Sequence, residues 1–371
     1  MSVTPEAVVV SFRLGGADGV AVEARKWEWA LGELGFEVRR VAGAIEDDGR
    51  PADTVLPGLA IDAPGGKPDG AVPLDEADIT AALHGADLVI VDNLCSLPLN
   101  VEAAAVVARV AAGHRGRVLF RHHDLPWQRR HLAHLGADLP PRVPGAMHAT
   151  INLRSRRELE ARGYSGAATI HNFFDLDPPP GDRPATRARF GFRDDELVLL
   201  QPSRAIERKN VPGAVRVATH LARMTERPVH LWVSGPAEDG YHETLARIIE
   251  RAEMPVSLGR ADRVVDAYAA CDVVVFPSTW EGFGNPVIES IAARRPCAAF
   301  PYPVLSEILA AGVRCFSTEQ PDVLVRFLNE PDARRETYFD VNLRRASVSF
   351  ALEDLPGTIE QAFVAHGWTA W

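Results

Sequence analysis

A turn between two regular elements carries the strongest chemical signal in the sequence. A strand that stops at Pro277, a turn at residues 282–285 and a following helix are predicted by the segment CDVVVFPSTWEGFGNPVIES. We expect Asn285 to cap this helix and Pro286 to take its first position, where the missing N–H costs nothing. The free amides and the dipole of the helix N-terminus then form an anion-binding site.

Two glutamates lie on either side of this turn, with seven residues between them. Glu281 precedes the turn, and Glu289 falls in the first turn of the expected helix. Carboxylates beside an anion site suit a ligand that also presents hydroxyl groups, because a carboxylate accepts hydrogen bonds from a diol. A nucleotide sugar presents such groups on both sides of its diphosphate. Taken separately, Glu281 also fits an exposed loop acid, and Glu289 an ordinary acid near a helix N-terminus.

Two cations follow an earlier predicted strand. The strand LVLLQPS ends just before Arg204, Lys209 lies five residues further on, and Asn210 is expected to cap the next helix. A planar guanidinium and a compact ammonium together suit the oxygens of a diphosphate. The alternative is a pair of solvated surface cations.

A third polar group ends the predicted strand RVLFRH and consists of His122, His123 and Asp124. Two histidines and an aspartate could indicate a metal site. Adjacent residues of a strand point to opposite faces, however, and do not easily share one ion. We therefore expect no metal at these residues.

Short apolar strands alternate with longer helical segments, which is typical of βαβ units around parallel sheets. One set of strands is predicted at AVVVSF, FEVRRVA, ADLVIVDN, RVLFRH and ATIHNF, and a second at LVLLQPS, PVHLWVS, VSLG, CDVVVFP and PCAAFP. Between the sets, three consecutive prolines at 178–180 can continue neither a helix nor a central strand. In such sheets ligands bind at the carboxyl ends of the strands, where the polar groups above are found.

The predicted fold class is therefore α/β, with two Rossmann-like domains facing each other across a cleft. We expect residues 1–173 to form the first domain, on the acceptor side, and residues 174–350 to form the second, which binds the nucleotide sugar. Residues 351–371 are expected to be a C-terminal helix that packs back on the first domain. Residues 50–72 are rich in Pro, Gly and Asp and predict a loop.

The composition fits this organisation. A chain of 371 residues with 46% hydrophobic residues can fill two cores. Its formal net charge of -10 argues against a broad nucleic-acid or anionic-membrane surface. The sequence shows neither a bilayer-spanning apolar run nor a signal peptide, which predicts a cytoplasmic protein. The four scattered cysteines form no CxxC pair and predict buried free thiols.

The order of these motifs closely resembles the second domain of the family 4 retaining glycosyltransferases, which have the GT-B fold. The resemblance is carried by PSRAIERKN, VSGPAED, VSLG and DAYAACDVVVFPSTWEGFGNPVIES. In the first domain it extends to a Gly-rich turn followed by Asp18 and Gly19, so it covers nearly the whole chain. It implies a nucleotide-sugar-dependent hexosyltransferase that needs no metal or other cofactor.

The family's roles can be carried over to matching positions of this sequence. Catalytic roles are implied for His123, Glu281, Arg204 and Lys209. In this assignment His123 lies against the donor sugar, Glu281 holds the transferred sugar and Glu289 the ribose. The full set implied for donor binding is Gly15, Gly16, Ser203, Arg204, Lys209, Gly235, Leu258, Gly259, Glu281, Gly282, Phe283, Gly284, Asn285, Pro286 and Glu289.

The first domain offers further expectations. Gly15 and Gly16 would let the backbone approach a ligand closely. The third glycine of a dinucleotide fingerprint is missing, so the turn does not predict NAD binding. Trp127, Arg129 and Arg130 are candidates for contact with the acceptor, with ordinary surface roles as the alternative.

Two features depart from simple expectations. Arg295, Pro301 and Pro303 stand where the family usually has glycines, which bears on the loop that follows and not on the donor site. Asp175 and Asp177 form a DxD pair of the kind that metal-dependent glycosyltransferases of another fold use. Because the pair lies in the proline-rich linker, we interpret it as a hinge.

Donor and partner identity rest on weaker signals. DGVAVEARKW together with RHHDLPW is similar to segments of mannosyl- and glucosyltransferases that act on soluble saccharides, which favours GDP-mannose over UDP-glucose. We expect a nucleotide sugar donor, a saccharide acceptor, no nucleic acid and no transmembrane segment. The sequence leaves the oligomeric state open, with a homodimer as one alternative. A sugar-nucleotide epimerase on the same fold and a carbohydrate-binding protein without activity are the other function classes.

Overall fold

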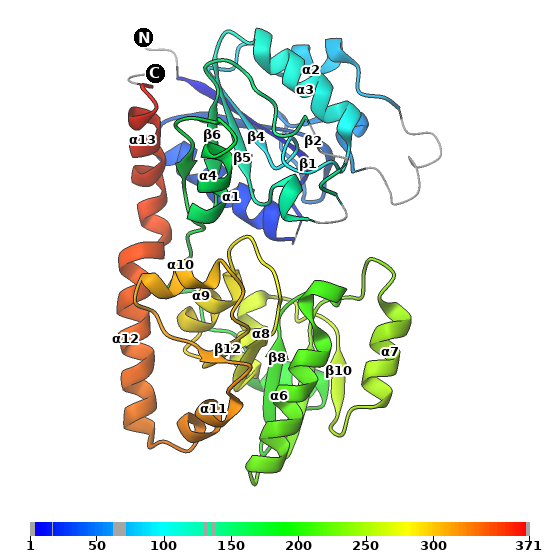
Figure 1. Ribbon diagram of the computed structural model, residues 1–371, viewed down its shortest axis with the longest axis vertical. Helices are drawn as coiled ribbons and strands as arrows, with labels where there is room; N and C mark the ends of the chain where they lie inside the picture. Colours follow the sequence, from blue (N-terminus) through cyan, green and yellow to red (C-terminus); the bar gives the residue numbers. More distant parts are fainter. Residues whose placement is uncertain (1–3, 17, 62–71, 130–131, 135–137, 369–371) are drawn as a thin grey trace. The chain divides into compact units, whose positions relative to one another are not determined.

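The computed structural model describes residues 4–16, 18–61, 72–129, 132–134 and 138–368 (Figure 1). The chain divides into two compact units. Unit 1 consists of Met1–Phe173 and Glu353–Trp371, and unit 2 consists of Phe174–Leu352. Each unit is built around its own parallel sheet with helices on both faces, as the sequence predicts for this fold class.

Unit 1 has, within its described residues, a seven-stranded sheet in the order β3-β2-β1-β4-β5-β6-β7. The strands are β1 (Glu6–Leu14), β2 (Glu37–Ile45), β3 (Thr54–Val55), β4 (Leu88–Asp92), β5 (Arg117–His122), β6 (Met147–Thr150) and β7 (Ala168–Thr169). The helices are α1 (Gly19–Glu33), η1 (Pro57–Leu59), α2 (Glu76–Ala82), α3 (Val101–Gly113), η2 (Pro126–Gln128), α4 (Leu153–Glu160) and α13 (Leu355–Ala365). Along β1, Val8 and Val10 pack with α2 and α3, whereas Val9 packs with α1.

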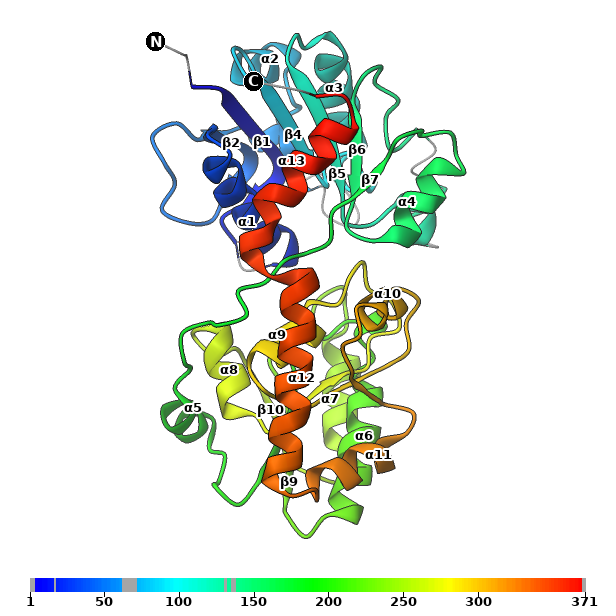
Figure 2. The ribbon, with the colours of Figure 1, turned by 90° about the vertical axis from the view of Figure 1, so that its left-hand side faces the viewer.

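Helix α13 completes unit 1 although it comes from the far end of the chain. It contacts α1, and its buried residues are Leu355, Ile359 and Phe363 (Figure 2). The prediction of a C-terminal helix that returns to the first domain is thereby confirmed. Helix α12 (Asp332–Phe350) precedes it and belongs to unit 2.

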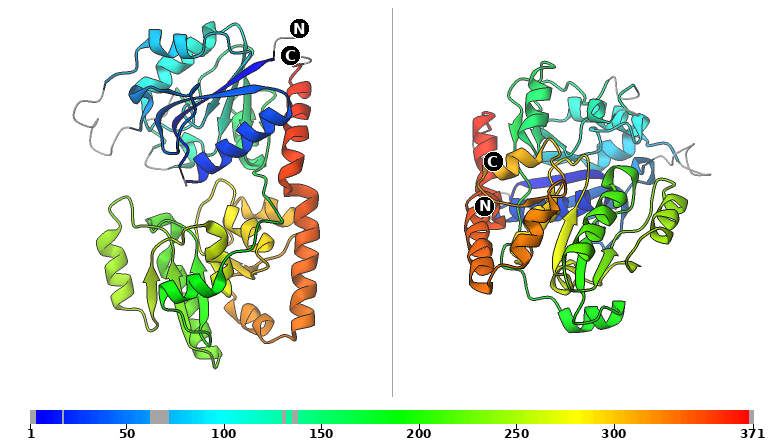
Figure 3. Two further views of the ribbon diagram at one scale, coloured as in Figure 1. Left: turned by 180° about the vertical axis from the view of Figure 1, so that it is seen from behind. Right: turned by 60° about the horizontal axis from the view of Figure 1, so that its bottom comes forward.

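Unit 2 has, within its described residues, a six-stranded sheet in the order β10-β9-β8-β11-β12-β13. The strands are β8 (Leu197–Gln201), β9 (Val229–Val233), β10 (Val256–Leu258), β11 (Val273–Phe276), β12 (Cys297–Ala299) and β13 (Phe316–Ser317). The helices besides α12 are α5 (Arg183–Phe190), η3 (Glu207–Lys209), α6 (Val211–Met224), α7 (His242–Glu250), α8 (Val264–Ala270), α9 (Asn285–Ala292), α10 (Leu305–Ala310) and α11 (Pro321–Leu328), and η4 (Leu352–Asp354) spans the unit boundary. Helices α6 and α11 pack on one face of the sheet, and α9 lies against β11, β12 and α12 (Figure 3).

The structure differs from the predicted elements mainly at sheet edges. Strands β3, β6 and β13 are absent from the prediction because they are too short to show a pattern, and β7 keeps only two residues of the predicted ATIHNF. The expected loop at 50–72 contains β3 and η1, and Asn100 fixes it by donating to Gly58 O and Ala60 O at 3.0 and 2.7 Å. Residues 62–71 of that segment lie outside the described residues.

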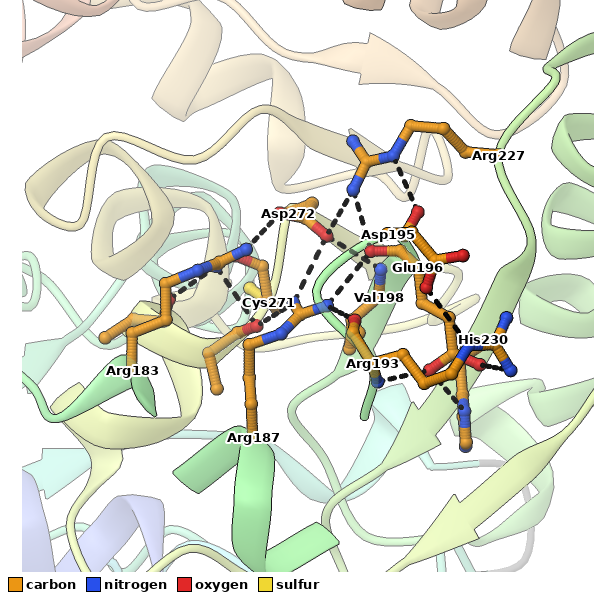
Figure 4. A network of polar contacts seen from close by, with 12 residues as sticks. Arg183, Arg187, Arg193, Asp195, Glu196, Val198, Arg227, His230, Cys271 and Asp272 are labelled. Atoms are coloured by element: carbon orange, nitrogen blue, oxygen red, sulfur yellow. Dashed lines mark hydrogen bonds and ion pairs between the residues drawn. The ribbon is translucent and has the colours of Figure 1, made fainter. Parts of the chain in front are cut away.

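A buried polar network holds the amino ends of the strands in unit 2 together (Figure 4). Asp272, which precedes β11, accepts hydrogen bonds from Arg183 of α5 at 2.7 Å and from the backbone N of Val198 at 2.8 Å. Arg187 is only 3% exposed and donates to Ala270 O and Glu196 O at 2.9 and 3.0 Å. The network therefore ties α5 to two neighbouring strands at the edge opposite the predicted ligand site.

Replacing Arg187 by methionine keeps most of the side-chain volume and removes these hydrogen bonds. Because carbonyl groups and Asp272 then lose a buried donor, we expect the free energy of unfolding to fall by about 3 kcal/mol. Urea unfolding measures the change. The exposed Arg223, paired with Glu253 at 2.9 Å, supplies the control, since Arg223→Met should leave stability nearly unchanged. Equal effects of the two variants would contradict the structural role of Arg187.

Candidate active site

A buried ion pair lies at the carboxyl ends of β8 and β11 in unit 2. Lys209 of η3 donates to Glu281 at 2.6 Å, and Arg208 donates to the other carboxylate oxygen at 3.2 Å. The side chains of Lys209 and Glu281 are each 11% exposed. Burial by itself raises the pKa of Glu281, but Lys209 and Arg208 outweigh it and hold the pKa below its ordinary value. Glu281 is therefore a carboxylate at neutral pH, held between two cations.

The loop that carries Lys209 is positioned by buried amides. The Gln201 side chain donates to Lys209 O at 3.0 Å, and that of Asn210 donates to Pro277 O at 3.1 Å. Asn210 also accepts from Gly213 N at 3.1 Å, so the prediction that it caps α6 is confirmed. These bonds join the end of β8 to the end of β11, which brings Lys209 and Glu281 together.

Arg204, predicted to act with Lys209, forms a separate pair. Its guanidinium donates to Glu238 at 2.7 Å, and both side chains are more than a third exposed. A Cβ at Gly235 would lie 2.4 Å from Arg204 N and from Ser203 O, so the loops after β8 and β9 approach each other too closely for any other residue. Burial lowers the pKa of Lys209, and the positive charge of the nearby Arg204 lowers it further.

Aromatic side chains of unit 2 hold the glycine turn that follows Glu281. Gly284, not Asn285 as predicted, is the N-cap of α9, and its φ of 127° is open to glycine. The Tyr302 hydroxyl donates to Phe283 O at 2.8 Å and would lie 1.8 Å from a Cβ at Gly284. Phe283 is 3% exposed and packs between Phe174 and Phe350, so its side chain anchors the turn in the core.

Glu289 lies further along α9 than predicted. The helix begins at Asn285, with Pro286 beside it, and has no acidic residue in its first turn. Glu289 therefore falls in the second turn, where it accepts a hydrogen bond from the Tyr268 hydroxyl at 2.5 Å. Burial and Glu289 raise the pKa of Tyr268 well above its ordinary value, so Tyr268 is a phenol that orients this carboxylate.

Leu258 ends β10 at the edge of the sheet, two strands away from β8, and Gly259 follows it. Leu258 is 48% exposed, and Gly259 has a φ of 123° and accepts from the Trp232 indole at 2.8 Å. The structure thus brings Lys209, Glu281 and the glycine turn together, places Arg204 nearby, and leaves Leu258 and Gly259 at the periphery.

In unit 1 the three residues of the predicted polar group at the end of β5 bond to different partners. His122 bonds to Ser96 Oγ at 2.7 Å and to His148 at 3.0 Å. His123 bonds to Asp92 at 3.1 Å, and Asp124 pairs with Arg129 at 2.6 Å. The expected divergence of the two histidines is confirmed.

The glycines of the first turn have neighbours on the protein itself. A Cβ at Gly15 would lie 2.7 Å from Asp47, and one at Gly16 would lie 2.5 Å from the Glu46 carboxylate. Asp18 caps α1 by accepting from Val20 N at 3.0 Å. Gly15, with a φ of 78° and the Asp47 backbone N 2.7 Å from its Cβ position, is therefore required for packing of the β1 turn against the end of β2, whereas at Gly16 the Glu46 side chain can move away.

The remaining predicted residues have structural partners. The Trp127 indole donates to Glu158 at 2.9 Å, and Arg130 lies outside the described residues. Asp175 accepts from the backbone N of Asp177 at 3.0 Å, a local turn in the linker. Arg295 donates to Tyr268 O and Ala269 O, both at 3.0 Å, beneath the site. In the described part of the chain, His, Cys, Asp and Glu side chains form no group of three or more placed to hold a metal ion.

Sequence reasoning missed four polar residues of these sites: Arg208, Tyr268, Tyr302 and Asp92. Arg208 stands beside Lys209 in the same motif, and Asp92 ends a predicted strand, so both could be found from position. The two tyrosines carry no local signal, because their roles depend on packing between distant segments. All four cysteines are free, as predicted, although Cys315 is only partly buried.

Burial of His148 beside His122 predicts that the stability of the protein depends on pH. Burial, with His366 and Arg142 nearby, lowers the pKa of His148 to about 4. The unfolded chain takes up a proton near pH 6.5, whereas the folded protein takes it up only near pH 4. Stability from neutral His148 is therefore complete above about pH 6.5 and is lost as the pH falls towards 4, by about 3 kcal/mol in all.

Urea unfolding at several pH values measures this loss. In His148→Phe, which keeps a ring between Phe120 and Tyr164, the slope of stability against pH over this range should be smaller by about one proton. An unchanged slope would show that His148 titrates normally in the folded protein.

The chain is similar in sequence to known glycosyltransferases. Residues 182–331 match the family described as Glycosyl transferases group 1. Mannosylglucosylglycerate synthase of Thermotoga maritima is 27% identical over an alignment of 426 residues that covers 94% of this chain and 97% of that protein. D-inositol 3-phosphate glycosyltransferase of Mycobacteroides abscessus is 35% identical over 142 residues, 35% of this chain and 30% of that protein.

Solved structures show the same fold. Anabaena Alr3699/HepE in complex with UDP and glucose superposes with a TM-score of 0.74 at 18% identity, covering 97% of this chain and 99% of that one. No helix among the described residues combines the length and apolar character that crossing a bilayer requires.

Proposed function

We propose that the chain is a group 1 glycosyltransferase, a retaining enzyme of the GT-B fold that uses a nucleotide sugar, and that it transfers mannose from GDP-mannose to a hydroxyl of a soluble saccharide. Mannose is supported by the name of the relatives that share most of the chain's length, which are mannosylglucosylglycerate synthases. UDP-glucose is the alternative donor, since HepE has been solved with it.

The observation that carries the proposal is the Lys209–Glu281 pair beside the N-terminus of α9. Lys209, Arg204, Arg208 and the first amides of α9 supply positive charge for a diphosphate without a metal ion. Glu281 and Glu289 supply carboxylates for the hydroxyls of the sugar and the ribose. We further propose Ser203 and the glycine turn, and separately Gly15, Gly16 and His123, as residues for donor binding.

Transfer then needs little covalent chemistry from the protein. The bond between C1 of the sugar and the diphosphate oxygen breaks as the acceptor oxygen attacks C1 on the same face. A diphosphate oxygen takes the acceptor's proton, and the cations stabilise the leaving charge. Because Glu281 is already held by Lys209 and Arg208, we assign it to positioning of the sugar rather than to nucleophilic attack.

Thermal unfolding in the presence of GDP, UDP and ADP sugars tests the donor. A ligand at about 100 times its Kd stabilises the folded state by about 2.7 kcal/mol. We expect GDP-mannose to raise Tm more than UDP-glucose or ADP-glucose. A shift with UDP-glucose alone would replace mannose by glucose in the proposal.

Substitution of Lys209 tests the site. Lys209→Met removes a cation from the leaving diphosphate, so kcat/KM for transfer should fall on the order of 10²-fold or more. The exposed Arg216 on α6 provides the matched control, and Arg216→Met should keep wild-type turnover. Near-wild-type transfer by Lys209→Met, with its fold intact by circular dichroism, would refute the assignment.

A further inference from the structure

A chain of buried charges runs beneath His123 in unit 1. Asp92 at the end of β4 contacts His123 at 3.1 Å and Arg121 at 3.2 Å. Arg121 lies 3.8 Å from Glu23 of α1, which pairs with Lys26 at 2.6 Å. We call these five residues the Asp92 network. Asp92, Arg121 and Glu23 are each 1% exposed, so the network is built into the core rather than the surface.

Acidic and basic side chains alternate along the network. Burial tends to raise the pKa of Asp92, but Arg121 and His123 more than offset it and hold the pKa below its ordinary value. Arg121 is further held by the Trp27 ring, 4.8 Å from the guanidinium carbon. Asp92 is therefore a carboxylate, and its partner nitrogen on the imidazole must be a donor.

The backbone around His123 is also constrained. Asn93, next to Asp92, has a φ of 60°, a left-handed conformation that is uncommon for residues other than glycine. Its side-chain oxygen accepts from the backbone N of His123 at 3.2 Å. Asparagine adopts this conformation more readily than most residues, because its short polar side chain can hydrogen-bond to nearby backbone. Both the backbone and the ring of His123 are thus fixed from the end of β4.

From this arrangement we propose that Asp92 is a positioning residue for transfer, acting through His123. By accepting a hydrogen bond from Nε2–H, Asp92 fixes the tautomer and the plane of the imidazole. Nδ1, which lies outside the network, is then an acceptor for a hydroxyl of the bound sugar. The inference rests on the proposed function, because it requires that His123 meets the donor sugar.

Asp92→Asn tests the proposal, because the amide keeps the shape of the side chain and can donate to Nε2, which favours the other tautomer. We expect kcat/KM for transfer to fall on the order of 10²-fold. Binding of GDP alone, followed by thermal shift, should be unchanged, since the diphosphate cations lie in unit 2. A general structural defect would weaken GDP binding as well as transfer.

A double-mutant cycle isolates the path through His123. If Asp92 acts through the imidazole, Asp92→Asn should have no further effect on transfer in a His123→Ala background. An equal loss in both backgrounds would overturn the proposal. Wild-type transfer by Asp92→Asn would do the same, whereas a wild-type protein that transfers from no nucleotide sugar would refute the proposed function instead.

Two more variants keep the test decisive. If Asp92→Asn unfolds because Arg121 loses its partner, Asp92→Asn with Arg121→Gln removes both buried charges together, and the same cycle is run on that pair. Asp272→Asn is the matched control, because it also removes a carboxylate beside a buried arginine but lies at the amino ends of the unit 2 strands. It should lower stability and leave kcat/KM for transfer at the wild-type value.

Discussion

Burial of a lysine beside a glutamate is favourable only where close geometry and further hydrogen bonds offset the desolvation of both charges. Unit 2 meets this condition at Lys209 and Glu281 through segments 72 residues apart in sequence. Amides of Gln201 and Asn210 hold the lysine loop against the end of β11. The glycine turn and the start of α9 follow Glu281 directly in sequence, and Tyr302 supports that turn, so the geometry of this edge of unit 2 depends on the pair.

Unit 1 handles charge at its strand ends differently. There the carboxylate of Asp92 and the guanidinium of Arg121 are almost completely buried near the ends of β4 and β5, and the side chains of Asn93, His122 and His123 are buried beside them. A parallel sheet covered on both faces leaves few positions for polar side chains except the ends of strands. Both units therefore place polar groups at the carboxyl edge of the sheet. Unit 2 has partly buried cations paired with glutamates, and unit 1 has a buried network that ends at a histidine.

Most of the fold could be predicted from the sequence because its central strands are continuous apolar runs, such as AVVVSF and CDVVVFP. The two-residue edge strands β3 and β13 could not, since their pairing depends on neighbours rather than on their own residues. Within the site, Lys209, Glu281 and the Asn210 cap followed from local motifs. Tyr268 and Tyr302 did not, and the cap of α9 was assigned one residue late because glycine at a φ of 127° replaces a side-chain cap.

The order of segments in unit 1 has a consequence for synthesis of the protein. Helix α13 packs against α1, yet the ribosome makes all of unit 2 between these two helices. Topologically, unit 2 is an insertion within unit 1, and its backbone joins both passages where Phe174 pairs with Ala351. Unit 2 has its complete sequence before unit 1 does. The α13 surface of α1 therefore stays uncovered until α13 itself has left the ribosome.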